Sequence, residues 1–191
     1  NTLDQTYSNL LTESFSQLTR QSDDAQLLFQ TQFDSANAQL GAAVDALFPA
    51  NNYLATTLKA VVKTIKIRSL LGLRRQTFFV QYGGWDHHGE LLETQAGMLA
   101  YLDAAIGAYQ QALEMLGLQD DVITFTASDF GRTLRSNGRG TDHAWGGHQF
   151  VLVGAVRPGI YGRIPEFALG GPEDANNRGV WIPKIFTSQF G

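Results

Sequence analysis

The sequence contains no cysteine. It therefore has no disulfide, no thiolate metal site and no cysteine nucleophile. Charged residues are scarce, at 17% of the 191 residues, and the formal net charge is −4. An acidic chain lacks the basic surface that binds nucleic acid, so no nucleic-acid partner is predicted. No apolar run reaches the roughly 18 residues of a transmembrane helix, so no membrane span is predicted.

The remaining composition is that of a globular protein. Hydrophobic residues make up 43% of the chain, and 191 residues are enough to bury a sizeable core. No signal peptide is visible. The chain begins at Asn1 rather than at Met and stops at Gly191 without a closing element. We therefore expect a processed form or a carboxy-terminal segment of a longer protein.

The first part of the chain, residues 1–75, has the apolar spacing of helices and is predicted to form a helical layer. The expected helices are residues 4–18, a second that Asp23 or Asp24 caps and that ends before Pro49, and residues 52–71. Lysines 59, 63 and 66 lie on one face of the last helix. A solvated lysine face is favoured there over an anion-binding surface.

Three short apolar runs predict strands. They are residues 77–82 (TFFVQY), 122–127 (VITFTA) and 150–156 (FVLVGAV). The apolar stripe between residues 92 and 116 predicts a helix that joins the first two strands. A strand, helix and strand of this length predict a βαβ unit with parallel strands. We therefore expect an α/β fold with a mostly parallel sheet, in which residues 76–157 form the core and residues 158–191 an irregular covering segment.

Polar clusters follow the predicted strands. Residues 83–90 read GGWDHHGE, and residues 128–133 read SDFGRT. Because parallel strands end at the same edge of a sheet, Asp86 and Asp129 are expected to lie near one another. A glycine-rich loop over residues 134–147 adds Asp142 and His143 to the candidates.

Carboxylates and imidazoles together are the ligand set of zinc, manganese or iron. Carboxylates so close would repel one another unless a cation lay between them. The predicted metal ligands are Asp86, His88, Asp129, Asp142 and His143. Arg132 is predicted to hold a tetrahedral oxyanion with its planar guanidinium.

Each candidate also has a structural interpretation. Asp86 could cap the following helix, and Asp129 could be a turn residue. Adjacent side chains on an extended backbone point apart, so at most one of His87 and His88 is expected to be a ligand. Asp142 and His143 could be a surface pair, His148 a partly buried histidine, and Arg132 an ion-pair partner of Asp129.

Taken in order, these motifs resemble the DUF1501 family. The matching stretches are residues 83–88, 122–133, 140–147 (GTDHAWGG) and 170–172. The family is grouped with the alkaline-phosphatase-like superfamily and often carries a twin-arginine export signal. The resemblance therefore implies an α/β/α sandwich, two metal positions and residence in the periplasm or outside the cell. Phe130 stands where that superfamily has a histidine.

The sequence thus predicts a metal-dependent hydrolase of phosphate or sulfate esters, with zinc or manganese as the metal and a small anionic ester as substrate. By the resemblance, Asp86, His88 and His143 hold one ion and Asp129 contributes to a second. The superfamily's nucleophile lies upstream of the matched motifs. The alternative is a non-catalytic envelope or binding protein that keeps the fold without a complete active site.

Overall fold

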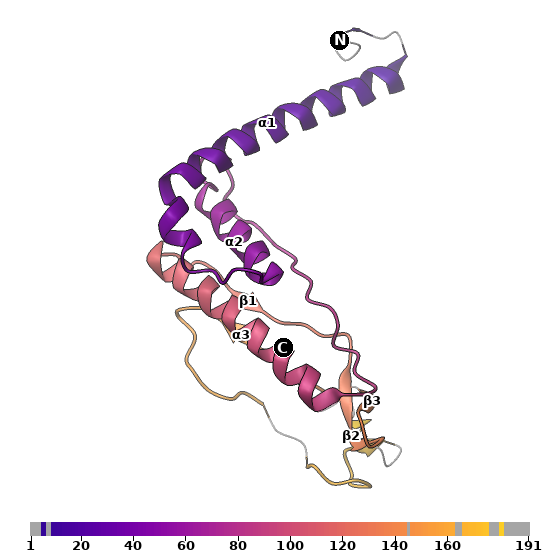
Figure 1. The fold of residues 1–191 in the computed structure, drawn as a ribbon. Helices are drawn as coiled ribbons and strands as arrows, with labels where there is room; N and C mark the ends of the chain where they lie inside the picture. The colour runs from indigo at the N-terminus through magenta and orange to yellow at the C-terminus, as the bar shows by residue number, and fades with distance from the viewer. Residues whose placement is uncertain (1–4, 7–8, 145, 163–165, 176–179, 182–191) are drawn as a thin grey trace. The chain divides into compact units, whose positions relative to one another are not determined.

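A computed structural model describes residues 5–6, 9–144, 146–162, 166–175 and 180–181 (Figure 1). The chain forms two compact units, Asn1–Val80 and Gln81–Gly191. Each unit is described by itself. No described helix combines the length and the apolar character that crossing a bilayer requires.

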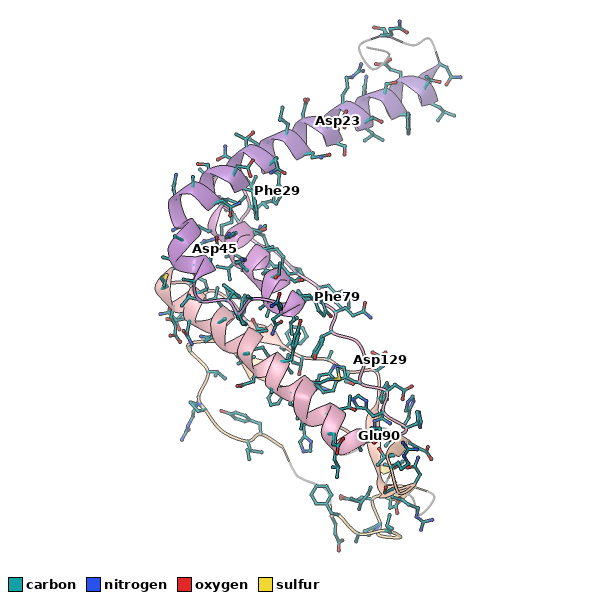
Figure 2. All side chains as sticks on the ribbon, in the orientation of Figure 1. Asp23, Phe29, Asp45, Phe79, Glu90 and Asp129 are labelled. Atoms are coloured by element: carbon teal, nitrogen blue, oxygen red, sulfur yellow. The ribbon has the colours of Figure 1, made fainter. Side chains whose placement is uncertain are left out.

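The described part of the first unit contains two helices, α1 (Leu10–Asp45) and α2 (Tyr53–Lys66). The side chain of Asn9 caps α1 by accepting from two backbone N–H groups, and the side chain of Asn52 caps α2 by accepting from the backbone N–H of Ala55. The predicted break at Asp23 is wrong, since α1 continues through it and Asp23 is exposed (Figure 2). No glycine or proline occurs in α1 before Gly41, so nothing in the sequence interrupts the helix there.

The two helices pack through apolar side chains and one ion-pair cluster. Val44, Leu54 and Val62 are among the buried residues. Lys63 is also buried, and its Nζ lies 2.8 Å from Oδ1 of Asp45, while Lys59 Nζ lies 3.3 Å from the same oxygen. The hydrogen bond from Lys63 is the largest of the causes that lower the pKa of Asp45. Two of the three lysines on this face are therefore engaged with Asp45.

In its described residues the second unit contains one long helix, α3 (Leu91–Met115), and short strands. The strands are β1 (Thr124–Phe125), β2 (Gly131–Ser136), β3 (Thr141–Ala144), β4 (Val151–Leu152), β5 (Asp174–Ala175) and β6 (Val180–Trp181). They form three antiparallel pairs, β1 with β4, β2 with β3, and β5 with β6. The helix expected between residues 92 and 116 is confirmed.

The predicted parallel sheet, and with it the α/β/α sandwich, is wrong. Residues 77–82 form no strand, and Phe79 is 91% exposed (Figure 2). Thr124 in β1 instead pairs antiparallel with Leu152 in β4. The apolar runs predicted where strands could form, but the choice of partner depends on contacts distant in sequence, which a run of apolar residues does not encode.

Candidate metal centre

The site is built on the hairpin of β2 and β3, which replaces the loop expected over residues 134–147. Arg132 in β2 lies directly opposite His143 in β3. The turn that joins the strands is closed by Asn137, whose Oδ1 accepts from the backbone N–H groups of Arg139 and Gly140 at 3.0 and 2.7 Å. Asparagine favours such a turn because its side chain mimics a backbone acceptor.

The hairpin turn is tied to the loop that precedes α3. Asn137 Nδ2 donates to the carbonyl oxygen of His88 at 3.1 Å, and the backbone N–H of Leu91 donates to the carbonyl oxygen of Arg139 at 3.1 Å. Arg139 also forms an ion pair with Glu90. Figure 1 shows the hairpin beside the end of α3 at which this helix begins. The turn thus fixes the backbone that carries His88.

Gly140 allows this close approach. A Cβ atom at residue 140 would lie 2.6 Å from the carbonyl carbon of His88, 2.7 Å from the carbonyl oxygen of His87 and 2.9 Å from the backbone nitrogen of Gly89. Real Cβ contacts with backbone atoms are not this short. A glycine is therefore required where the hairpin meets the loop.

Three potential metal ligands converge where the β2–β3 hairpin meets the loop before α3. His143 Nε2 lies 2.7 Å from Oδ1 of Asp86, and His88 Nε2 lies 2.9 Å from the same oxygen. All three ligand atoms lie within 4.8 Å of one another. Each of the three side chains is about half exposed. The cluster therefore faces solvent, and a ligand that bound there could be reached from outside.

The electrostatic setting of Asp86 favours its charged form. The hydrogen bond from His143 is the largest cause of a lowered pKa of Asp86, and the charges of His88, His143 and Arg132 act in the same direction. Desolvation opposes these effects without overcoming them. The carboxylate is thus held ionised, which is the form that binds a cation.

Two further side chains support the imidazoles. Oδ1 of Asp142 lies 3.6 Å from Nδ1 of His88, the nitrogen that does not face Asp86. The ring of Phe130 stacks on the ring of His143, with centroids 3.9 Å apart and planes 7° apart. Metal-binding histidines usually donate their second ring N–H to a carboxylate or carbonyl, which fixes the ring and raises its basicity. Asp142 stands in the position for that role.

Arg132 is engaged with protein oxygens. Its NH1 donates to the carbonyl oxygen of Thr141 at 2.7 Å, and its NH2 donates to the carbonyl oxygen of Trp85 at 2.6 Å and to Asp86 Oδ1 at 3.3 Å. The guanidinium also lies 5.2 Å from the centroid of the Phe130 ring. These contacts join the hairpin to the segment that carries Asp86. Binding of an oxyanion by Arg132 stays a prediction.

The structure brings together only some of the residues predicted from the sequence. Asp86, His88 and His143 form the cluster, and Asp142 contacts it through His88. Asp129 is exposed and is not a member of the cluster among the described residues (Figure 2).

Neither of the other two histidines belongs to the cluster. His87 is buried, and its Nε2 has no hydrogen-bond partner among the described residues, whereas His148 is exposed. Of the adjacent pair, His88 alone faces the cluster, as the opposed directions of neighbouring side chains would require.

Sequence reasoning missed the hairpin and the supporting role of Phe130. The signal for the hairpin was the pair Asn137-Gly138, which favours a tight turn between two strands. Phe130 gave no such signal, because a ring contact with His143 depends on the register of the hairpin. The parallel sheet that was expected to bring the acidic groups together is not what does so.

Two imidazoles and a carboxylate, with His143 on the hairpin and Asp86 and His88 on the loop before α3, define a candidate centre for a divalent metal ion. The family model described as "Protein of unknown function (DUF1501)" matches residues 3–178. The chain therefore belongs to the DUF1501 family. Searches of curated proteins and of solved structures found no match to the chain.

Proposed function

We propose that the chain is part of a metal-dependent hydrolase of phosphate or sulfate esters, with Asp86, His88 and His143 as the protein ligands of one divalent ion. The observation that carries the proposal is the convergence of the three ligand atoms within 4.8 Å, on side chains that are about half exposed. Catalytic zinc sites commonly have three protein ligands and leave one position to water or substrate.

The spacing of the ligand atoms fits such an ion. Metal–ligand distances of about 2.0–2.1 Å in a tetrahedral site place the ligand atoms about 3.3 Å apart. The two Nε2–Oδ1 distances are 2.7 and 2.9 Å, so an ion requires the side chains to move outward by about half an ångström. The exposure of all three side chains permits this movement without a change of the hairpin.

The residues around the three ligands have different roles in this proposal. Asp142 orients His88 through Nδ1, and the Phe130 ring fixes the plane of the His143 imidazole. Arg132 is a positioning residue that holds Asp86 against the hairpin. A bound divalent ion would acidify a water molecule and polarise an oxygen of the ester. The exposed side of the cluster is where water and ester would approach.

We propose that each chain binds one metal ion. Asp129, expected to contribute to a second ion, is outside the cluster, and Phe130 occupies the sequence position of the superfamily's second-site histidine. Zinc or manganese is the expected metal, because the donor set is nitrogen and oxygen without sulfur. Placement in the alkaline-phosphatase-like superfamily and residence in the periplasm or outside the cell belong to the same proposal, and the order of the motifs supports them.

A second candidate is a non-catalytic binding protein that holds an ion for structural reasons. The observation that favours it is the set of contacts made by Arg132, which are directed at protein oxygens rather than toward open solvent. The two candidate functions differ in whether the metal-loaded protein hydrolyses esters. Under the second, the metal-loaded protein binds an ion with the same three ligands but hydrolyses no ester.

The test is a metal and activity analysis of the full-length protein. We expect about one zinc or manganese ion for each chain and hydrolysis of aryl phosphate or aryl sulfate esters. His143→Ala should lose both properties, while His148→Ala, a control at an exposed histidine outside the cluster, should keep both. Metal bound without hydrolysis by the full-length protein would select the second candidate. Equal metal content in both variants would reject the site itself.

A further inference from the structure

Helix α1 carries an apolar stripe along its first half. The stripe consists of Leu11, Phe15, Leu18, Ala25 and Phe29, with Ser22 completing the row. The spacing alternates between four and three residues, which places all six positions on one side of a helix. Leu11, Phe15 and Leu18 are 81%, 69% and 65% exposed, so a large apolar surface faces solvent.

The row of the stripe ends at Phe29 on the side of α1 that leads to Ala36. Ala36, seven residues beyond Phe29, is buried. However, α2 has 14 residues and α1 has 36, which correspond to about 21 Å and about 54 Å of helix. Among the described residues α2 therefore covers the end of α1 near Asp45 and leaves the stripe uncovered.

The rows beside the stripe carry no charge. They contain Thr12, Ser14, Thr19, Gln21 and Gln26. The charged residues of this half of the helix lie farther round, and one pair of them, Arg20 and Glu13, is already joined within α1 at 3.5 Å. Like charges on flanking rows would oppose the pairing of two identical helices. An uncharged flank permits a second copy of this chain to approach.

The sizes of the side chains select an orientation. In a parallel pair, each residue of the stripe faces its own copy, so Ser22 meets Ser22 and Ala25 meets Ala25, which leaves gaps. In an antiparallel pair centred near residue 20, Phe15 faces Ala25, Leu18 faces Ser22 and Leu11 faces Phe29. Large side chains then fill the space left by small ones, as close packing requires.

We propose that the stripe on α1 is a homodimer interface, in which two copies of the chain pair antiparallel about a two-fold axis near residue 20. Such an interface is isologous, because each copy contributes the same surface. The inference depends on α1 alone and is independent of the metal site.

Cysteine cross-linking tests the orientation cleanly, because the chain has no cysteine of its own. Phe15→Cys and Ala25→Cys chains, mixed and oxidised, should form a mixed disulfide dimer. Ala25→Cys alone should stay uncross-linked, because its two copies lie about 15 Å apart along the axis. Leu27 lies on the opposite side of the helix and is also exposed. Leu27→Cys is therefore the control, and it should not cross-link when it is mixed with Phe15→Cys or with Ala25→Cys.

Light scattering of the full chain gives the second measurement. We expect about twice the chain mass of 20.9 kDa at tens of micromolar. Leu18→Asp should raise the dissociation constant at least tenfold with unchanged helix content by circular dichroism, while Leu27→Asp should leave it unchanged. A monomer at these concentrations, a strong cross-link of Ala25→Cys alone, or equal effects of the two aspartates would each overturn the proposal.

Discussion

Replacing Asp142 tests whether a carboxylate beside His88 tunes the affinity of the proposed metal site. Removal of such an outer partner commonly lowers metal affinity by about 10–100-fold. Asp142 Oδ1 lies 3.6 Å from Nδ1 of His88, slightly beyond hydrogen-bond distance, and both side chains are about half exposed. We therefore expect the lower end of that range, about tenfold or about 1.4 kcal/mol, for Asp142→Ala.

The assay is competition for zinc against a chromophoric chelator. Asp142→Asn keeps an oxygen acceptor and loses the charge, so its affinity should fall between those of wild type and Asp142→Ala. His148→Ala is the matched control and should bind as wild type does. Thermal unfolding of each metal-free variant separates loss of affinity from loss of fold. An affinity of Asp142→Ala equal to wild type would refute the orienting role, and complete loss of binding would make Asp142 a ligand instead.

Other predictions concern the scaffold. Gly140→Ala should weaken zinc binding at least tenfold, because its Cβ would meet the backbone of residues 87–89, whereas Gly107→Ala, which has no neighbour within 4 Å, should leave it unchanged by the same chelator assay. Asp45→Asn should lower the free energy of unfolding by about 1–3 kcal/mol in urea, because it leaves the buried Lys63 ammonium without its carboxylate. Lys63→Met should cost less, since an apolar side chain needs no partner there. The lowered pKa of Asp45 means that its stabilising effect is present above the ordinary value of 3.8 and is lost as pH falls through the lowered value. Asp45→Asn should therefore flatten the acid limb of stability against pH, and an unchanged limb would contradict the ion pair.

Local signals in the sequence predicted the helices better than the sheet. The apolar spacing from residue 52 onward located the start of α2, and the stripe between residues 92 and 116 located α3. These signals act within a few residues. The paired aspartates at residues 23 and 24 also resemble a helix start, but α1 passes through them because no glycine or proline stops it.

The pairing of strands depends on contacts that the sequence does not display locally. Residues 122–127 were predicted as a strand, and β1 lies within them, yet Phe125 pairs with Val151 in an antiparallel ladder. An apolar run is compatible with either direction of pairing. The parallel arrangement was inferred from the order of strand, helix and strand alone.

The sequence predicted part of the metal cluster correctly, but the structural feature that brings its residues together is not the one expected. Asp86, His88 and His143 do lie together, but a hairpin whose turn docks on the preceding loop brings them there. Asp129 follows β1, and its predicted position depended on a parallel sheet, whereas the described strands pair only antiparallel. The type of residue thus indicated the chemistry, while the register of β2 and β3 decided which residues take part.

The central claim is that one divalent ion binds between Asp86, His88 and His143. Crystals of the protein grown with zinc and measured at the zinc absorption edge test it most directly. We predict one anomalous peak for each chain, about 2.0–2.1 Å from the Nε2 atoms of His88 and His143 and close to a carboxylate oxygen of Asp86. A zinc-bound crystal with no peak at this cluster, or with its peak elsewhere in the chain, would contradict the account.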